Sequence, residues 1–433
     1  MARADTIFAL STAQGRSGVA MIRVSGSGAA EALETLSGEP KPRPRRAVLR
    51  RLRDAGDNEI DRALVLWFEA PASFTGEDSA EFHLHGGRAI VEATLGALSQ
   101  IPHLRPAEPG EFTRRAVENG KLDLTRAEAL ADLIDAETEA QRRQALRQYD
   151  GTLYELYEDW RARLIAAAAW AEAVIDFADE EIPEDVFGRA RTLIRRINTE
   201  IQTHLGDSHR GELVRDGLHL TVIGEPNAGK SSLVNALAKR DVAIVSETAG
   251  TTRDVIEVRL DLGGYLVTLA DTAGLRETGD AIEREGVRRA LARAEAADLV
   301  ILLQDGTAAK AAAFEGADLV VWNKADLPWP ERRDGLRLSL KTGDGLDALI
   351  AALTAKVAQK LEAPAEAPPI TRARHRHALE EAAKSLTRAQ TATEAELMAE
   401  DVRLAMRAIG RITGKVDVED LLDVIFRDFC IGK

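Results

Sequence analysis

The segment Gly224 to Ser231 (GEPNAGKS) has the residue types and the spacing of a phosphate-binding loop. It follows the apolar run Leu218 to Ile223 and precedes a predicted helix from Ser232 to Lys239. Glycines let backbone N–H groups approach a phosphate closely, and the N-terminus of a helix adds a favourable partial charge. We expect Lys230 to reach the β- and γ-phosphates and the Ser231 hydroxyl to ligate Mg²⁺. The sequence therefore predicts a nucleotide site.

Two segments with the chemistry of phosphate sensors follow the loop in the order that a GTPase requires. Gly250 to Asp254 (GTTRD) offers hydroxyls that can close over the γ-phosphate, with Thr252 the expected Mg²⁺ ligand. Asp271 to Gly274 (DTAG) follows the predicted strand Leu266 to Ala270. Its carboxylate can bind the Mg²⁺ shell, and its glycine N–H can sense the γ-phosphate.

A third segment can read the base. Asn323 to Asp326 (NKAD) follows the predicted strand Leu319 to Trp322, and Ser339 to Lys341 (SLK) is the expected last loop on the base side. The Asp326 carboxylate can accept from the N1–H and the exocyclic amine of guanine, whereas adenine has a lone pair at N1 and leaves the carboxylate unpaired. Each tetrapeptide alone is typical of a turn, but together, in this order, they predict GTP.

The catalytic group is less evident, because Leu275 stands where Ras-type GTPases have the glutamine that orients the attacking water. Glu283 lies in the polar run after this loop and can act as a base or position the water, although a surface carboxylate is the simpler reading of that residue alone. Arg253 and Arg276 are alternative charge stabilisers. A monovalent cation held by Asn227 and by switch-loop oxygens can also replace an arginine finger.

The surrounding sequence predicts a multidomain α+β and α/β protein. From Gly217 to about Lys360 the order strand, glycine loop, helix repeats, which is typical of a parallel α/β sheet. Helical periodicity dominates from Leu122 to about Leu205 and again after His375, and the proline-rich stretch Ala363 to Pro369 reads as a linker. We therefore expect a P-loop GTPase domain inserted into an α-helical bundle. The predicted boundaries are 1–120 for an N-terminal α+β domain, 121–214 and 363–433 for the two parts of the helical domain, and 215–362 for the inserted G domain.

Composition limits the alternatives. The chain has 433 residues and a net charge of −14, so a whole-surface basic footprint for nucleic acid is absent. A local RNA contact is conceivable at Lys41 to Arg53, with seven basic residues in thirteen, although a solvated strand or loop is the simpler interpretation. One cysteine, Cys430, excludes an intramolecular disulfide, and no apolar run approaches the roughly 20 residues of a membrane span. With no signal-peptide pattern at Met1 to Asp5, these features predict a cytoplasmic location.

The motifs resemble those of the TrmE–Era–Der group of GTPases, through Gly224 to Ser232 and Gly250 to Asp254. Further strings narrow the resemblance to the MnmE (TrmE) family of tRNA-modification GTPases, over essentially the whole chain. These strings are Ser73 to Asp78 with Glu81, Pro109 to Thr113 with Lys121 to Leu124, Asp176 to Ile182, and the terminal Phe429 to Lys433.

This resemblance implies an N-terminal domain that binds 5-formyl- or 5,10-methylene-tetrahydrofolate and forms a homodimer. It also implies a heterotetramer with MnmG, which uses FAD and NADH. Together they would attach an aminomethyl or carboxymethylaminomethyl group to C5 of the wobble uridine (position 34) of certain tRNAs, with the folate supplying the bridging carbon. Potassium would promote G-domain dimerisation and GTP hydrolysis.

Residue by residue, the resemblance raises Glu283 to the water-activating carboxylate. It implies folate contacts at Arg23, Glu81, Lys121 and Lys433, potassium ligands at Asn227, Ser246, Thr248 and Thr251, and Mg²⁺ ligands at Ser231 and Thr252. The predicted GTP-binding set is Asn227, Ala228, Gly229, Lys230, Ser231, Ser232, Ser246, Glu247, Thr248, Ala249, Gly250, Thr251, Thr252, Asp271, Thr272, Ala273, Gly274, Asn323, Lys324, Asp326, Ser339, Leu340 and Lys341.

The chemistry of the N-terminal and C-terminal residues leaves alternatives open. Arg23 and Lys121 can pair with the glutamate tail of a folate and Glu81 can accept from a pterin N–H, but ordinary ion pairs explain them equally simply. Cys430 is a candidate nucleophile toward C6 of uridine, which would activate C5, or a small buried apolar residue.

Two rival functions remain at this stage. A ribosome-assembly GTPase of the Era/Der type predicts a basic C-terminal RNA module, whereas residues 375–433 are helical in pattern and mixed in charge. A membrane-linked signalling GTPase predicts a lipid anchor or a basic amphipathic helix, and the sequence has neither pattern.

Overall fold

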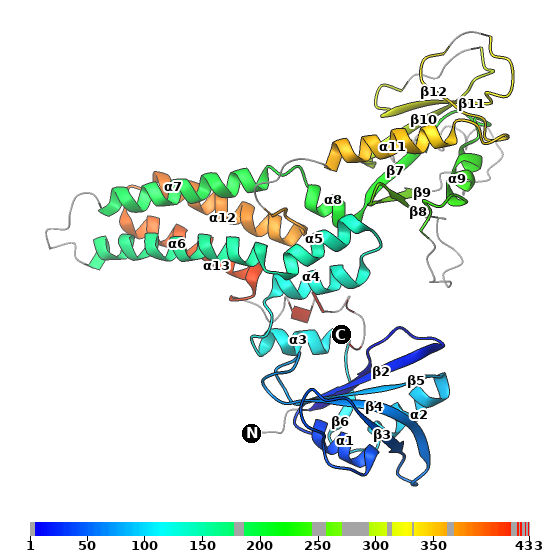
Figure 1. Cartoon of the computed structure of the whole chain (residues 1–433). Helices are drawn as coiled ribbons and strands as arrows, with labels where there is room; N and C mark the ends of the chain where they lie inside the picture. The colour runs from blue at the N-terminus through cyan, green and yellow to red at the C-terminus, as the bar shows by residue number, and fades with distance from the viewer. Residues whose placement is uncertain are drawn as a thin grey trace, which may run out of the picture. The chain divides into compact units, whose positions relative to one another are not determined.

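The computed structural model describes residues 5–176, 186–244, 257–270, 294–309, 314–330, 333–361 and 368–416, together with positions 422, 423, 425, 426, 429 and 432. The chain forms two compact units (Figure 1). One contains residues 1–131 and 407–433, and the other contains residues 132–406.

The first unit is built on a six-stranded sheet with the order β3-β4-β5-β2-β1-β6. Its strands are β1 (Thr6–Leu10), β2 (Ser17–Ser25), β3 (Val48–Arg53), β4 (Glu59–Phe68), β5 (Ser79–Gly86) and β6 (Leu104–Pro106). All neighbours are antiparallel except β1 and β6. Strand β5 shows the period of two, because Phe82 and Leu84 are buried while Glu81 and His83 point to the opposite face.

Helices α1 (Ala29–Ser37) and α2 (Arg88–Ser99) cover the face that carries Phe82. On the opposite face, Phe112 of α3 (Glu111–Glu118) packs with Ile7 and Ala9 of β1. The end of the chain also returns to this unit. A Cβ atom at Gly110 would lie 2.9 Å from Phe429 Cβ, and one at Gly432 would lie 2.2 Å from Leu10 O.

Helices from both flanks of the insertion pack together, as the sequence predicts. The flanks contain α4 (Leu124–Asp135), α5 (Glu139–Tyr149), α6 (Thr152–Asp176), α7 (Val186–Leu205), α8 (Arg210–Asp216), α12 (Ala373–Thr391) and α13 (Ala395–Thr413). Helix α7 contacts both α6 and α12, and Asn198 Nδ2 of α7 donates to Thr387 Oγ1 of α12 at 3.1 Å. The predicted bundle with an inserted α/β domain is therefore confirmed.

The chain leaves the bundle and re-enters it at adjacent points. Arg376 on α12 pairs with Asp207 just after α7 at 2.7 Å, and Arg215 Nη1 donates to Thr371 O at 3.1 Å. A Cβ at Gly211 would lie 2.2 Å from Ile370 O, so only glycine allows the two segments to approach this closely. These contacts fasten together the two ends of the inserted segment.

The inserted segment contains a second sheet, with the order β12-β11-β10-β7-β9-β8. Its elements are β7 (Leu218–Ile223), α9 (Lys230–Ala238), β8 (Glu257–Leu262), β9 (Tyr265–Ala270), β10 (Leu299–Asp305), β11 (Leu319–Asn323), β12 (Leu336–Arg337) and α11 (Leu346–Leu361). Every described pair is parallel except β8 with β9. The predicted parallel α/β sheet is confirmed, and the predicted strands before the P-loop and before Asn323 lie where the sequence places them.

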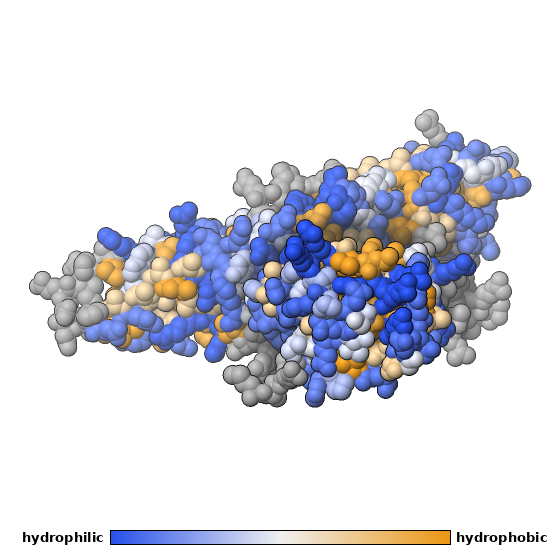
Figure 2. All heavy atoms as spheres, turned by 60° about the horizontal axis from the view of Figure 1, so that its bottom comes forward, coloured by the Kyte–Doolittle hydropathy of each residue, from blue (hydrophilic) through white to orange (hydrophobic). Residues whose placement is uncertain are grey.

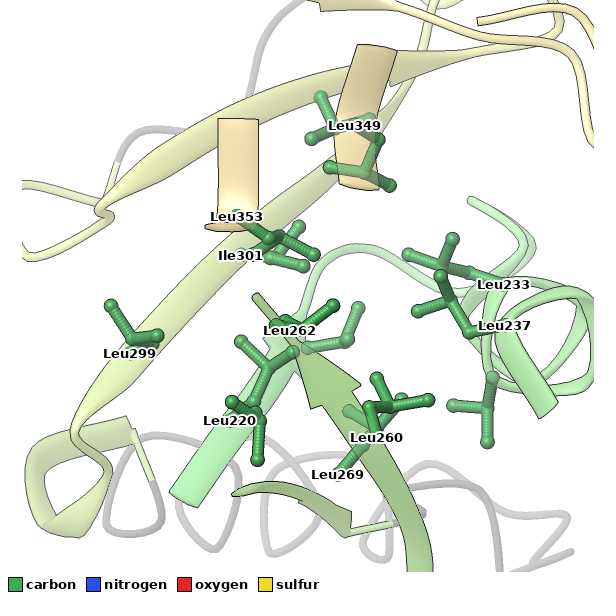
Figure 3. Packing of buried hydrophobic residues seen from close by; sticks show 14 of the residues in the cluster. Leu220, Leu233, Leu237, Leu260, Leu262, Leu269, Leu299, Ile301, Leu349 and Leu353 are labelled. Carbon is green, nitrogen blue, oxygen red and sulfur yellow. The ribbon is translucent and has the colours of Figure 1, made fainter. Parts of the chain in front are cut away.

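Leucine and isoleucine side chains from several strands and helices form the core of this domain (Figure 3). Leu220, Leu299 and Ile301 of the central strands pack with Leu349 and Leu353 of α11. The six residues from Leu299 to Gln304 are all buried, as expected for a strand covered on both faces. Among the described residues, no helix has the length and hydropathy that crossing a bilayer requires.

Candidate functional site: a nucleotide site and an arginine–glutamate pair

The predicted phosphate-binding loop connects the end of β7 to the start of α9. Gly224 has φ 153°, and an added Cβ would lie 2.0 Å from Leu303 O of β10. Gly229 has φ 105°, and its Cβ would lie 2.5 Å from Asn323 Nδ2. Both positions therefore require glycine, and α9 begins directly after the second with Lys230. The loop brings free N–H groups of a helix N-terminus to the carboxyl edge of the sheet.

Lys230 folds back over this loop. Its Nζ donates to Gly224 O at 2.8 Å and to Glu225 O at 2.9 Å. Burial lowers the pKa of the ammonium group. The Ser231 and Ser232 side chains are exposed in the first turn of α9, and Asn227 is exposed at φ 64° within the loop. The ammonium group therefore lies on the loop, with the exposed Ser231 next to it in the chain.

The predicted base-reading residues meet beside the same loop. Asn323 Nδ2 donates to Ala228 O at 2.8 Å, and Asn323 Oδ1 accepts from Leu340 N at 3.1 Å. Ser339 Oγ donates to Asp326 Oδ1 at 2.8 Å, although the two residues are thirteen positions apart. The structure therefore brings Asn323, Asp326 and the loop after β12 together. Asp326 itself is exposed, so its second carboxylate oxygen is accessible to a ligand.

Two of the predicted folate contacts form an ion pair on the N-terminal sheet. Arg23 of β2 and Glu81 of β5 are register partners, and Arg23 Nε and Nη2 both donate to Glu81 Oε1, at 3.1 and 3.0 Å. The Arg23 guanidinium lies 5.3 Å from the centre of the Phe74 ring and 5.8 Å from that of Phe112. The second oxygen, Glu81 Oε2, lies 3.4 Å from His83 Nε2.

Lys121 reaches the segment that carries Phe74, and not Arg23 or Glu81, among the hydrogen bonds and ion pairs of the described residues. Its Nζ donates to Pro71 O at 2.9 Å, and its Cγ would lie 3.3 Å from a Cβ at Gly76. In the described part of the chain, the loop from Pro71 to Gly76 links Lys121 to the Arg23–Glu81 pair.

Comparison with known proteins places the chain in a family. The model of the MnmE helical domain matches residues 124–430, and that of the GTP-binding protein TrmE N-terminus matches residues 6–121. The protein named tRNA modification GTPase MnmE of Parvibaculum lavamentivorans is 60% identical over 439 residues, covering 99% of this chain and 100% of that one. Its namesakes in Rhodospirillum rubrum and Paramagnetospirillum magneticum are 57% and 55% identical, each covering 99% of this chain and 99% and 100% of their own. The chain belongs to the MnmE family of tRNA modification GTPases.

Several site residues that the sequence or the MnmE resemblance singled out lie outside the described part of the chain. They are Ser246 to Thr252, Arg253, Asp271 to Gly274, Arg276, Glu283, Cys430 and Lys433. Of the predicted potassium and Mg²⁺ ligands, the structure therefore describes Asn227 and Ser231. Among the described residues, no group of three His, Cys, Asp or Glu side chains could hold a metal ion by itself.

The basic stretch Lys41 to Arg53 does not form a uniform cationic patch in this MnmE-family chain. Arg50 pairs with Glu39, Arg53 with Asp57 at 2.8 Å, and Lys41 with Glu69 at 3.7 Å. Arg45 donates to a backbone carbonyl, Ala72 O. Nearby acids thus offset much of the charge that made this stretch a candidate for RNA contact.

One residue of the nucleotide site was missed from the sequence. Asp305 ends β10 and pairs with Lys324 Nζ at 2.5 Å, next to the base-reading loop. Hydrogen bonds from Lys324 and Thr307 lower the pKa of Asp305, outweighing the effect of its burial, which would raise it. The available signal was its place, at the end of an apolar strand and before Gly306, where carboxyl ends of parallel strands converge.

Proposed function

We propose that this chain binds and hydrolyses GTP and, with the FAD protein MnmG, adds an aminomethyl or carboxymethylaminomethyl group to C5 of the wobble uridine in certain tRNAs. The observation that carries the nucleotide part is the meeting of Asn323, Asp326 and Ser339 beside the P-loop. Asp326 can satisfy both donors on the Watson–Crick edge of guanine, which adenine does not offer together. The family membership supports the tRNA part.

In this proposal, Ser231 and Thr252 ligate Mg²⁺, and Asn227, Ser246, Thr248 and Thr251 supply oxygens to potassium. Of these, Ser231 fits its role, since its hydroxyl is exposed in the first turn of α9 beside the P-loop. The bound Mg²⁺ would neutralise charge that develops on the β- and γ-phosphates. Lys230 binds those phosphates, and Glu283 positions the attacking water. Potassium-dependent pairing of two G domains completes the hydrolytic site.

The N-terminal unit would hold a tetrahydrofolate, with Arg23, Glu81, Lys121 and Lys433 as contacts. Both hydrogen bonds from Arg23 end on Glu81 Oε1. Oε2 lies 3.4 Å from His83 Nε2 and has a second lone pair that can accept from a pterin N–H. The Phe74 and Phe112 rings beside the guanidinium suit a flat heteroaromatic ligand. When bound, the folate would supply the one-carbon unit. The residues present therefore fit this cofactor.

A homodimer through the N-terminal domains is supported by apolar side chains on the same face of the sheet. Leu49 of β3 and Leu64 of β4 are register partners and are 64% and 48% exposed. Leu64 is the register partner of His83, which lies on the Glu81 face of β5. On the face that Figure 2 shows, hydrophobic residues form groups of different sizes among hydrophilic ones. The functional domains would be residues 1–120, 121–214 with 363–433, and 215–362.

Mass spectrometry of wobble uridines in tRNA from cells that lack this protein tests the whole proposal. We expect the C5 aminomethyl-type groups to disappear, to return with the intact gene, and to stay absent with a Lys230→Ala gene. Unchanged uridines would contradict the proposal and favour a ribosome-assembly GTPase of the Era/Der type.

The hydrolytic assignment has its own test. Replacing Glu283 by Ala should slow GTP turnover far more than it weakens GDP binding, because the side chain would act on the attacking water and not on the ground state. Steady-state hydrolysis in potassium buffer and calorimetric GDP titration measure the two effects. Near-normal turnover would remove Glu283 from the mechanism.

A further inference from the structure

The loop that carries Lys324 and Asp326 has an unusual backbone for its residue types. Lys324 has φ 66°, in the left-handed region that favours glycine. A lysine in that region is strained, so surrounding contacts must hold it there. Its side chain is fixed by Asp305, as described above. The backbone of the same residue needs a separate anchor.

Trp329 supplies that anchor. Its indole Nε1 donates to Lys324 O at 3.0 Å, and the Leu327 amide donates to the same carbonyl at 3.0 Å. The guanidinium of Arg337, a residue of strand β12, lies 4.1 Å from the centre of the indole ring. The half-buried tryptophan thus closes the loop of six residues whose first and third members are Lys324 and Asp326.

The indole packs against the backbone of Gly306, which has no side chain. A Cβ at this glycine would lie 2.2 to 2.5 Å from three atoms of the Trp329 ring. The Gly306 amide also donates to Asn323 O at 3.0 Å. One glycine therefore connects the ends of β10 and β11 and leaves the space that the indole fills.

We propose that Trp329, packed against Gly306, is a positioning residue for guanine recognition. It does not touch the nucleotide; it holds Lys324 in its left-handed conformation and thereby keeps Asp326 in place before the base arrives. Preorganisation of this kind lowers the cost of binding, so its loss weakens affinity and base discrimination without changing the chemical step. This inference rests on the proposed binding of guanine nucleotides.

The test compares Trp329→Phe and Trp329→Ala in the full chain, by calorimetric titration with GDP and with IDP in Mg²⁺ buffer. The phenylalanine keeps a ring but loses the N–H, and we expect about a 3-fold weaker GDP affinity, whereas the alanine should cost about 10-fold or more. The ratio of the IDP to the GDP dissociation constant should fall in the alanine variant, because Asp326 reads the exocyclic amine that inosine lacks. KM for GTP should rise while kcat stays within about 2-fold. Trp170→Phe, on α6, is the matched control.

The Gly306→Ala variant tests the contact between Gly306 and Trp329 from the glycine. Its methyl group should displace the indole and weaken GDP binding as much as Trp329→Ala does. In the Gly306→Ala/Trp329→Ala double variant the clash is absent, so we expect no further loss. Additive losses would show that Gly306 acts by another route, and an unchanged GDP affinity in Trp329→Ala would overturn the inference.

Hydrogen exchange of the nucleotide-free chain separates this inference from the proposed function. The Ala325 amide donates to Leu338 O, just after β12, and the Leu327 amide donates to Lys324 O within the loop. They should exchange faster in Trp329→Ala than in the unmodified chain, and equal exchange would overturn the positioning role. A chain that binds no GDP would contradict the proposed function but leave this comparison decisive.

Discussion

The base side of the nucleotide site and the Arg23–Glu81 pair of the N-terminal sheet both display polar side chains, but different groups hold those side chains. In the G domain, Asn323 is held between Ala228 O and Leu340 N, and Asp326 accepts from a neutral hydroxyl. On the N-terminal sheet, the two charged side chains hold each other. The charge of Asp326 is therefore left for a ligand, whereas a ligand of the N-terminal pair has to share groups that are already engaged.

The two regions should therefore respond differently to substitutions. Where the backbone holds the reading groups, a substitution should change ligand binding and leave the local fold nearly unaffected. Where opposite charges hold each other in a half-buried setting, removing one should destabilise the sheet, because the other remains without its partner.

The largest effect is expected for Lys230→Ala. Among the described residues the ammonium donates to two loop carbonyls, so its loss should change thermal unfolding little. Loss of its charge-assisted bonds to phosphate should weaken GTP binding about 100-fold and abolish turnover. Calorimetric titration measures the affinity, with the exposed Lys239→Ala at the end of α9 as the control. A large drop in melting temperature would place this region in the same class as the N-terminal pair.

Asp326→Asn should reverse the base preference. The asparagine can still accept from Ser339 Oγ, so the loop should persist, but its amide opposes the donors of guanine and matches the carbonyl of xanthine. We expect GDP affinity to fall about 100-fold and XDP to become the better ligand. Competition titrations with the two nucleotides measure this change, and Asp334→Asn, exposed on the loop before β12, is the control. Retained selectivity for GDP would reject the base-reading role of Asp326.

The same contrast explains what could be predicted from the sequence. The P-loop and the base-reading tetrapeptide are contiguous, and their strands are uninterrupted apolar runs, so local pattern was enough to predict both the motif and its place in the sheet. Asp305 and Trp329 belong to the same site but act on Lys324 across separations of 19 and 5 residues. No local pattern encodes those pairings, because they depend on how β10, β11 and the following loop converge.

The N-terminal region was harder for a similar reason. Arg23 and Glu81 are 58 residues apart and meet only through the register of β2 with β5. From their types alone they read as ordinary ion pairs, and only the family resemblance singled them out. The helical flanks were predictable as helices from their periodicity, but the fastening of Arg376 to Asp207 depends on tertiary packing that periodicity does not specify.

A double-mutant cycle on Arg23 and Glu81 should give an intermediate effect, in stability. Each alanine variant should lower the local stability of the sheet by about 1 to 2 kcal/mol, and the double variant should lose less than the sum, with a coupling of about 1 kcal/mol. Hydrogen exchange of β2 and β5 amides measures this without assuming that the whole chain unfolds in one step. Lys121→Ala is the control, because the Lys121 ammonium donates to a backbone carbonyl, Pro71 O. If the two alanine substitutions lowered the local stability additively, Arg23 and Glu81 would not hold each other, and the proposed difference between the two regions would be wrong.

The smallest effect is expected where a polar group belongs to neither region. His204 of α7 is buried against Tyr157 and Trp160, and this burial lowers its pKa to about 4 from an ordinary 6.5; Asp207 opposes the shift, and Arg376 and His375 add to it. The unfolded chain binds this proton below pH 6.5 and the folded chain only below about pH 4. The histidine therefore contributes its full stability above pH 6.5 and loses it as the pH falls toward 4. When the pH falls from 7.5 to 5.5, the free energy of unfolding of the unmodified chain should decrease by about 1 kcal/mol more than that of His204→Phe. Urea titrations monitored by circular dichroism measure both. GDP affinity should be equal in the two proteins, because a pKa that is shifted chiefly by burial reports packing. A binding site also needs an accessible group such as Asp326.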